Sequence, residues 1–246
     1  MFSVHLIEVI DLKKYYRSGL FNRQCTRAID GASFHIDRGE TLGLVGKSGC
    51  GKTTLGRLLL RLIEPTSGKI FFDSKEITRL NRREMRRLRP RMQMIFQDPE
   101  SSLNPKMRTA ESIAEPFRLG LRGRMNRSEI EEKSLELIDA VGLNAEHLNR
   151  FPHQLSGGQN QRVVLARILA IKPEFIVADE PTASLDVSAQ AKILRLMMDL
   201  KSEFGLTMLF ISHDREVVEH MSDRIAFIEK GSISWEEGLN SIRDIC

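Results

Sequence analysis

Apolar positions along the chain fall into short continuous runs that alternate with stretches of helical spacing. The runs have the length of strands and predict strands over 6–12, 32–36, 41–45, 92–96, 175–178 and 207–212. Helical spacing and turn residues predict helices over 52–63, 128–141, 159–171 and 187–204, with an irregular region around Pro99, Pro105 and Pro116. Strands that alternate with helices indicate an α/β fold, in which a mainly parallel sheet is covered by helices on both faces.

Length and composition fit one folded domain over residues 1–246. The chain is 41% hydrophobic and has neither an internal repeat nor a Ser/Gly-rich linker, which excludes a low-complexity disordered protein and favours one domain with a helical insertion. No apolar run approaches the roughly 18 residues that cross a bilayer. The N-terminus lacks the basic and purely apolar segments of a signal peptide. We therefore expect a cytoplasmic protein, unless a partner holds it at a membrane.

The cysteines are Cys25, Cys50 and Cys246, an odd number at scattered positions. A disulfide framework needs paired cysteines, and a zinc site needs clustered ligands. This pattern predicts neither of them and fits a reducing compartment.

The formal charge of +4 is unevenly distributed, because seven arginines lie between Arg79 and Arg91. One interpretation is a binding patch for nucleic acid or lipid headgroups. The other is a solvated helix face whose charge Glu84 partly offsets. No aromatic residue interleaves with the arginines for base stacking, which favours the solvated face.

A glycine-rich segment follows the predicted strand at 41–45 and precedes the helix predicted from residue 52. It matches the phosphate-binding pattern G-x-x-x-x-G-K-[ST]. Glycines allow backbone N–H groups to surround phosphate oxygens at the positive end of a helix. We expect Lys52 to neutralise the β- and γ-phosphates of a nucleotide and Thr53 to coordinate Mg²⁺. The expected nucleotide contacts of this segment are Gly46, Lys47, Ser48, Gly49, Cys50, Gly51, Lys52, Thr53 and Thr54.

Two acidic residues, Asp179 and Glu180, end the apolar run at 175–178. Ligands of parallel α/β sheets bind at the carboxyl ends of the strands. We therefore expect Asp179 to hold Mg²⁺ through water and Glu180 to act as the general base on the attacking water. Such a pair is a weak signal alone and becomes strong together with a phosphate-binding loop.

A third segment, Leu-Ser-Gly-Gly-Gln at 155–159, precedes another predicted helix. The Ser156 hydroxyl and the N–H groups of Gly157 and Gly158 form a second potential anion site at a helix N-terminus. With this segment the chain resembles the ATP-binding-cassette (ABC) ATPases, whose signature it matches. The resemblance extends over essentially the whole chain. It implies that Ser156, Gly157, Gly158 and Gln159 contact ATP held on a facing subunit.

The resemblance implies roles for residues outside these three segments. Gln97 corresponds to the glutamine that senses Mg²⁺ or the attacking water and couples to membrane subunits. His213 corresponds to the switch histidine that contacts the γ-phosphate and orients Glu180. Asp186 belongs to the loop that links two active sites. The aromatic residue that stacks on adenine is Tyr16 or its neighbour Tyr15, and we favour Tyr16. The implied catalytic residues are Glu180, His213 and Gln97, and the implied metal ligands are Thr53, Gln97 and Asp179.

The resemblance also implies a fold and partners. The fold is a P-loop NTPase core with an N-terminal antiparallel β subdomain and a helical insertion at about 98–165. Strings at 97–105, 151–154 and 41–46 resemble those of oligopeptide, dipeptide and nickel importers. Such a protein uses ATP and Mg²⁺, dimerises head to tail with itself or a second ABC ATPase, and contacts two membrane-spanning permease subunits at the cytoplasmic face of the membrane. An external substrate-binding protein is an indirect partner.

Two alternative functions share the same ATP chemistry. An ABC ATPase that acts on nucleic acid or ribosomes usually carries a long coiled coil or two cassettes, whereas only about 100 residues separate Lys52 from Ser156 here. An exporter ATPase is disfavoured by the importer-like strings. The leading expectation is therefore the energy-coupling ATPase of an importer for peptides or nickel and metal chelates, with nucleic acid not expected as a partner.

Overall fold

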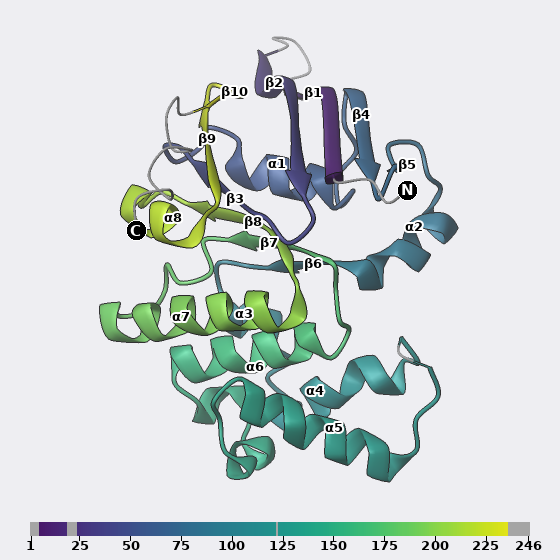
Figure 1. Cartoon of the computed structure of the whole chain (residues 1–246), viewed down its shortest axis with the longest axis vertical. Coiled ribbons are helices and arrows are strands. Elements are labelled where there is room, and N and C mark those ends of the chain that lie inside the picture. The colour runs from purple at the N-terminus through teal and green to yellow at the C-terminus, as the bar shows by residue number, and fades with distance from the viewer. Residues whose placement is uncertain (1–4, 19–23, 122, 236–246) are drawn as a thin grey trace. The chain divides into compact units, whose positions relative to one another are not determined.

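The computed structural model describes residues 5–18, 24–121 and 123–235, so Cys246 lies outside the described residues. The chain divides into two compact units. The first contains residues 1–87, 177–179 and 207–246, and the second contains residues 88–176 and 180–206. Figure 1 labels the helices and strands in chain order.

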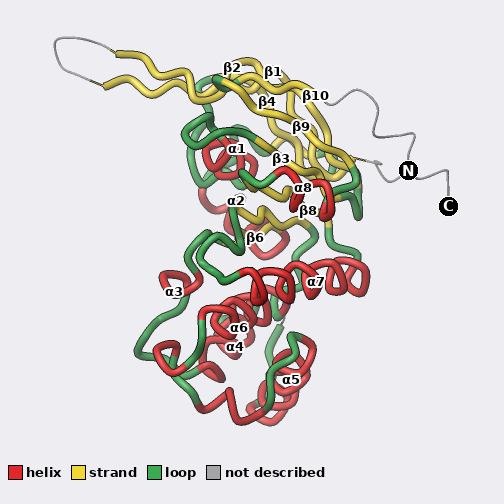
Figure 2. Tube along the Cα trace, turned by 90° about the vertical axis from the view of Figure 1, so that its left-hand side faces the viewer, coloured by secondary structure: helices red, strands yellow, loops and turns green. Residues whose placement is uncertain are grey.

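An antiparallel four-stranded sheet in the first unit has the order β2-β1-β4-β5. Its strands are β1 (His5–Ser18), β2 (Gln24–Asp37), β4 (Ser67–Phe72) and β5 (Lys75–Glu76). The strands predicted over 6–12 and 32–36 are too short, because the polar halves of β1 and β2 pair with each other as far as Ser18 and Gln24. Figure 2 shows these two strands running side by side. Their ladder shifts register between Lys14 and Tyr15, which leaves Ala28 without a partner residue.

The second sheet has six strands in the order β10-β9-β3-β8-β7-β6. They are β3 (Thr41–Val45), β6 (Met92–Ile95), β7 (Phe175–Asp179), β8 (Thr207–Ser212), β9 (Arg224–Glu229) and β10 (Ser232–Trp235). β3 is parallel to both β8 and β9, and β10 is antiparallel to β9. Every residue of β7 and β8 is buried, as their uninterrupted apolar sequences predict.

Three helices belong to the first unit, in whole or for all but one residue: α1 (Lys52–Leu59), α2 (Arg82–Leu88) and α8 (Arg215–Met221). The prediction that the first helix continues to residue 63 is wrong. Arg61 has a left-handed φ of 51°, which ends the helix. This turn directs the buried Arg61 guanidinium to the Ile77 carbonyl at 3.0 Å and to the Glu64 carboxylate at 2.7 Å.

The second unit is mainly helical. Its helices are α3 (Pro99–Ser102), α4 (Thr109–Arg118), α5 (Arg127–Ala140), α6 (Gly157–Leu169) and α7 (Val187–Phe204), with short 3₁₀ turns at Arg89–Arg91, Ala145–Asn149 and Pro152–Gln154. The expected irregular region is instead partly helical. Pro99 begins α3, where a missing N–H costs nothing, and Pro116 lies inside α4, near its end.

Candidate nucleotide-binding site

The phosphate-binding loop connects the buried strand β3 to α1, as predicted. Gly51 is the N-cap residue of α1 and has a φ of 114°. The Lys52 ammonium donates hydrogen bonds to the carbonyls of Gly46 at 2.6 Å and Lys47 at 3.1 Å. Lys52 is only 6% exposed, so this cation is held inside the curve of the loop. The arrangement places a positive charge where the phosphates of a nucleotide are expected.

Two glycines are required by close approach of other backbone. A Cβ atom on Gly46 would lie 2.6 Å from the Ile228 carbonyl oxygen, and one on Gly51 would lie 2.3 Å from the Ala28 carbonyl oxygen. The loop is therefore packed directly against β9 on one side and β2 on the other.

Thr53 and Asp179 meet although they lie far apart in the sequence. The Thr53 hydroxyl donates a hydrogen bond to an Asp179 carboxylate oxygen at 3.1 Å. Asp179 is 7% exposed at the end of β7, and both residues belong to the first unit. A hydroxyl and a carboxylate are oxygen ligands of the kind that Mg²⁺ prefers. The structure thus joins two of the expected metal ligands in one place.

His213 follows β8, the neighbour of β3. In this parallel pair Val45 lies opposite Ser212, so His213 and the phosphate-binding loop leave the sheet at the same edge. The Ser212 hydroxyl accepts a hydrogen bond from the Asp214 N–H at 3.0 Å, which fixes the turn after the strand. The first unit therefore contributes the loop, Asp179 and His213 to one sheet edge.

Glu180 and Gln97 belong to the second unit. Glu180 directly follows β7 and has a left-handed φ of 48°. A non-glycine residue held in that conformation costs about 1–3 kcal/mol, and such strain concentrates at active sites. Gln97 is exposed shortly after β6.

The two candidate tyrosines have different surroundings. The Tyr15 hydroxyl donates a hydrogen bond to Asp30, which also forms an ion pair with Arg27 at 3.2 Å. These contacts lower the pKa of Asp30, with the Tyr15 hydrogen bond as the main cause. Tyr16 is 43% exposed, and the Lys14 ammonium lies 4.9 Å from its ring centroid. Tyr15 is therefore engaged within the sheet, whereas Tyr16 presents its ring to solvent.

The signature segment caps α6 in the second unit. The Ser156 hydroxyl accepts a hydrogen bond from the Gln159 N–H at 3.3 Å, and the Gln159 side chain accepts one from the Ser156 N–H at 3.0 Å. This cap starts α6 at Gly157, two residues earlier than predicted. A Cβ atom on Gly157 would lie 3.1 Å from the Leu185 side chain, and one on Gly158 would lie 3.4 Å from Ala189. The glycines thus let the start of α6 approach the start of α7.

A cavity of about 350 Å³ lies beside these two helix starts. Ser156, Gly158 and Gln159 line it from α6 and its cap. Asp186 lines it as the N-cap of α7, where its carboxylate accepts a hydrogen bond from the Ala189 N–H at 2.8 Å. The sequence did not indicate Lys192, which lines the same cavity and lies one and a half turns along α7. No motif marks this lysine, because only the folding of α7 against α6 brings it there.

Neighbouring polar residues support the signature segment. Asn160 is fully buried and donates a hydrogen bond to the Pro152 carbonyl at 3.0 Å. Arg162 donates to the Val141 carbonyl at 2.5 Å, and burial lowers its pKa.

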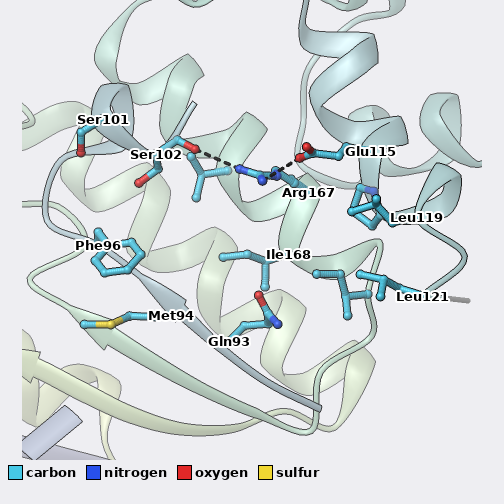
Figure 3. Close-up of a pocket in the computed structure, with 13 residues that line it drawn as sticks. Gln93, Met94, Phe96, Ser101, Ser102, Glu115, Leu119, Leu121, Arg167 and Ile168 are labelled. Carbon is cyan, nitrogen blue, oxygen red and sulfur yellow. Dashed lines mark hydrogen bonds and ion pairs between the residues drawn. The ribbon is translucent and has the colours of Figure 1, made fainter. Parts of the chain in front are cut away.

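A larger cavity of about 570 Å³ lies elsewhere in the second unit. Figure 3 shows Phe96, Leu119 and Leu121 at its wall, together with the Arg167 guanidinium. These three apolar residues are 42%, 68% and 40% exposed. Arg167 donates to the Ser102 carbonyl at 2.9 Å and to the Glu115 carboxylate at 2.7 Å, so it ties α6 to α3 and α4. The cavity is therefore open and has an apolar wall, and the hydrogen-bonded Arg167 forms one polar side of it.

Among the described residues, one group has the composition of a transition-metal site. His5, His35 and Asp37 offer ligand atoms within 4.8 Å of one another on β1 and β2. Asp37 already bonds His5 at 2.5 Å, and Arg224 donates to the His35 ring nitrogen at 3.2 Å. The guanidinium therefore competes with a cation for the second histidine, and it links β2 of the first sheet to β9 of the second by hydrogen bonds.

No helix in the described parts of the chain combines the length and the apolar character needed to span a bilayer.

The chain is similar to several known proteins. Residues 29–183 match the model of the ABC transporter family. The oligopeptide transport ATP-binding protein AppF of Bacillus subtilis is 46% identical over 97% of this chain and 74% of its own length. The dipeptide transport ATP-binding protein DppF of Escherichia coli is 42% identical over 92% of this chain and 68% of its own length.

Solved structures agree with these sequence relatives. The ATP-binding cassette MJ0796, in a dimeric post-hydrolysis state bound to ADP and Pi, superposes with a TM-score of 0.84 at 31% identity, over 95% of this chain and 98% of that one. The predicted fold, a P-loop core with an antiparallel β subdomain and an inserted helical part, is confirmed. The family match covers more than half of the chain, and the curated relatives cover nearly all of it. The chain therefore belongs to the ABC transporter family.

Proposed function

We propose that this chain is the ATP-hydrolysing, energy-coupling subunit of an ABC importer for peptides. The observation that carries the proposal is the hydrogen bond between Thr53 and Asp179, because it joins the phosphate-binding loop to the carboxylate strand. The relatives' names support the cargo, since AppF and DppF are named as oligopeptide and dipeptide transport proteins. The direction is supported by a 47% identical relative in Brucella ovis that is named a putative peptide import ATP-binding protein. Nickel and metal chelates remain a prediction from the sequence alone.

The proposed chemistry distributes its steps among the residues of the site. Lys52 and the loop N–H groups bind the β- and γ-phosphates, and Tyr16 stacks on the adenine. Thr53 and Asp179, with Gln97, would hold Mg²⁺, which would neutralise charge that develops on the phosphates. Glu180 accepts a proton from the attacking water. His213 contacts the γ-phosphate and orients Glu180.

The signature segment acts on a second subunit in this proposal. The start of α6 offers the Ser156 hydroxyl and glycine N–H groups, with no acidic residue in its first turn. It is therefore suited to bind the γ-phosphate of ATP held by a facing cassette. Two chains arranged head to tail form two such sites, as the dimeric state of MJ0796 supports.

The cavity of about 570 Å³ in the second unit is the proposed contact for a membrane-spanning permease subunit. Its wall includes Phe96, next to Gln97, and the Ser101-Ser102 stretch that follows the glutamine (Figure 3). Exposed apolar side chains beside a fixed arginine can receive an amphipathic segment of another protein. Two permease subunits would place this chain at the cytoplasmic face of the membrane, where an external binding protein acts on it only indirectly.

A single substitution tests the proposed ATPase chemistry. The Glu180→Gln variant should bind ATP as the unaltered chain does, lose phosphate release, and accumulate as a closed dimer with ATP. A matched control is Glu203→Gln, which makes the same chemical change at an exposed position near the end of α7 and should leave turnover unchanged. Phosphate release that persists in Glu180→Gln would refute the assignment of the base.

A second experiment tests the importer assignment. Purification from gently solubilised native membranes should recover two polytopic membrane proteins and a second cassette ATPase. The Phe96→Ala variant should lose these proteins while keeping its ATP binding, because Phe96 lies at the wall of the cavity of about 570 Å³. Recovery with nucleic acid or ribosomes, and without membrane proteins, would refute the importer and leave the ATPase assignment intact.

A further inference from the structure

Helix α2 carries four arginines on one side. These residues form the arginine face: Arg82, Arg83, Arg86 and Arg87. All four side chains are exposed. At about 100° per residue these positions span an arc of about 140°. The one buried residue of the helix, Met85, points to the opposite side. The helix is therefore fixed by its apolar side and presents four guanidinium groups together.

The arginine face has no compensating acid. None of its four arginines has an ion pair or hydrogen bond among the described residues. Glu84, the single acidic residue of the helix, lies about 60° beyond Arg87 around the helix axis, and its carboxylate accepts a hydrogen bond from the Asn81 N–H at 3.0 Å instead of pairing with an arginine. Two exposed arginines on other helices do have acidic partners: Arg127 pairs with Glu131 at 2.9 Å, and Arg195 pairs with Asp199 at 3.2 Å.

Four like charges on a short helix repel one another unless an anionic partner lies against them. Guanidinium groups bind phosphate in a bidentate geometry. We propose that the arginine face binds an anionic membrane surface through the phosphate groups of its lipids. The helix is only about 10 Å long, and no aromatic side chain accompanies its arginines for base stacking. These features fit a flat layer of headgroups better than a nucleic-acid strand.

This membrane contact does not depend on the proposed docking of permease subunits, because its binding partner is the lipid itself. Each arginine near an anionic surface contributes a roughly fivefold increase in binding. Removal of all four should therefore weaken binding by several hundredfold, and high salt should weaken it as well.

The test is co-sedimentation of the purified full chain with vesicles of phosphatidylcholine, with and without phosphatidylglycerol. The unaltered chain should bind the vesicles that contain phosphatidylglycerol and should not bind phosphatidylcholine alone. Replacement of the whole arginine face by glutamine should abolish binding, and replacement by lysine should retain most of it. ATP turnover in solution should stay unchanged in both variants, which shows that they are folded.

A matched control removes four cations that have acidic partners. This paired set is Arg127, Lys133, Arg195 and Arg215. Its replacement by glutamine changes the net charge equally and should leave vesicle binding in place. Equal loss in both sets, or equal binding to uncharged vesicles, would overturn the proposal. Displacement by millimolar glycerol phosphate would assign the face to a soluble phosphate, and binding of duplex DNA without binding of vesicles would assign it to nucleic acid; either result refutes the membrane contact.

Discussion

Gly51 offers a quantitative test of how the phosphate-binding loop is held. In the Gly51→Ala variant the new methyl group would lie 2.3 Å from the Ala28 carbonyl oxygen, at a φ of 114°. Backbone strain of this kind costs about 1–3 kcal/mol. Forced overpacking costs about 1–3 kcal/mol more. We therefore expect the free energy of unfolding to fall by about 2–6 kcal/mol, and ATP affinity to fall with it because the loop must shift.

Gly49→Ala is the matched control. Gly49 lies in the same loop and has a φ of 77°, but a Cβ atom there would meet nothing within 4 Å. This variant should lose only about 1–2 kcal/mol, the cost of the left-handed conformation. Trp235 is the single tryptophan and belongs to the first unit, so its fluorescence during urea unfolding measures both variants. Equal losses in Gly49→Ala and Gly51→Ala would show that contact with Ala28 does not constrain the loop.

Three further variants test other contacts of the structure. Tyr15→Phe removes the main cause of the low pKa of Asp30. A carboxylate with a lowered folded pKa stabilises the protein above its unfolded value and loses that stabilisation as the pH falls. Below about pH 4, the unaltered chain should therefore lose more stability in urea titrations than Tyr15→Phe, and parallel pH profiles would contradict this. Ser156→Ala removes the cap of α6 and should lower stability by about 1 kcal/mol, and unchanged steady-state ATP turnover would contradict the proposed role in the dimer. Glu40→Gln breaks the pair with Arg224 at 2.5 Å, and because Glu40 is 9% exposed we expect a loss of about 2–3 kcal/mol in urea unfolding. A loss under about 0.5 kcal/mol would show that the Arg224 contacts to His35 suffice.

Local sequence signals were sufficient to predict the bounds of some strands and helices. The strands β3 and β8 and the helix α7 have the predicted bounds. α7 has an acidic N-cap at Asp186 and a glycine C-cap at Gly205, which mark both ends in the sequence. By contrast, α2 has a single buried residue and no apolar repeat, and β4 is fully buried at only two of its six positions, so neither gave a periodic signal.

The candidate site was predictable where its residues are contiguous in the sequence. The loop, the Asp179-Glu180 pair and the signature segment are each short strings with a recognisable pattern. The contact between Thr53 and Asp179 spans 126 residues and results from strand order, which local sequence does not encode. The difference between the surroundings of Tyr15 and Tyr16 is also tertiary, because Tyr15 donates a hydrogen bond to Asp30 and Tyr16 is exposed. The adenine contact of Tyr16 stays a prediction.

The register shift at Ala28 has a consequence for nucleotide preference. The Ala28 carbonyl faces Gly51 of the phosphate-binding loop, and the same pair of strands carries Tyr16, which directly follows the shift between Lys14 and Tyr15. One piece of backbone thus presents both the proposed base contact and a wall of the phosphate contact. Laboratory selection for use of a different purine should therefore yield substitutions along β1 and β2, at positions that do not contact a phosphate. Laboratory selection for a nucleotide with a different number of phosphates should yield substitutions in the phosphate-binding loop.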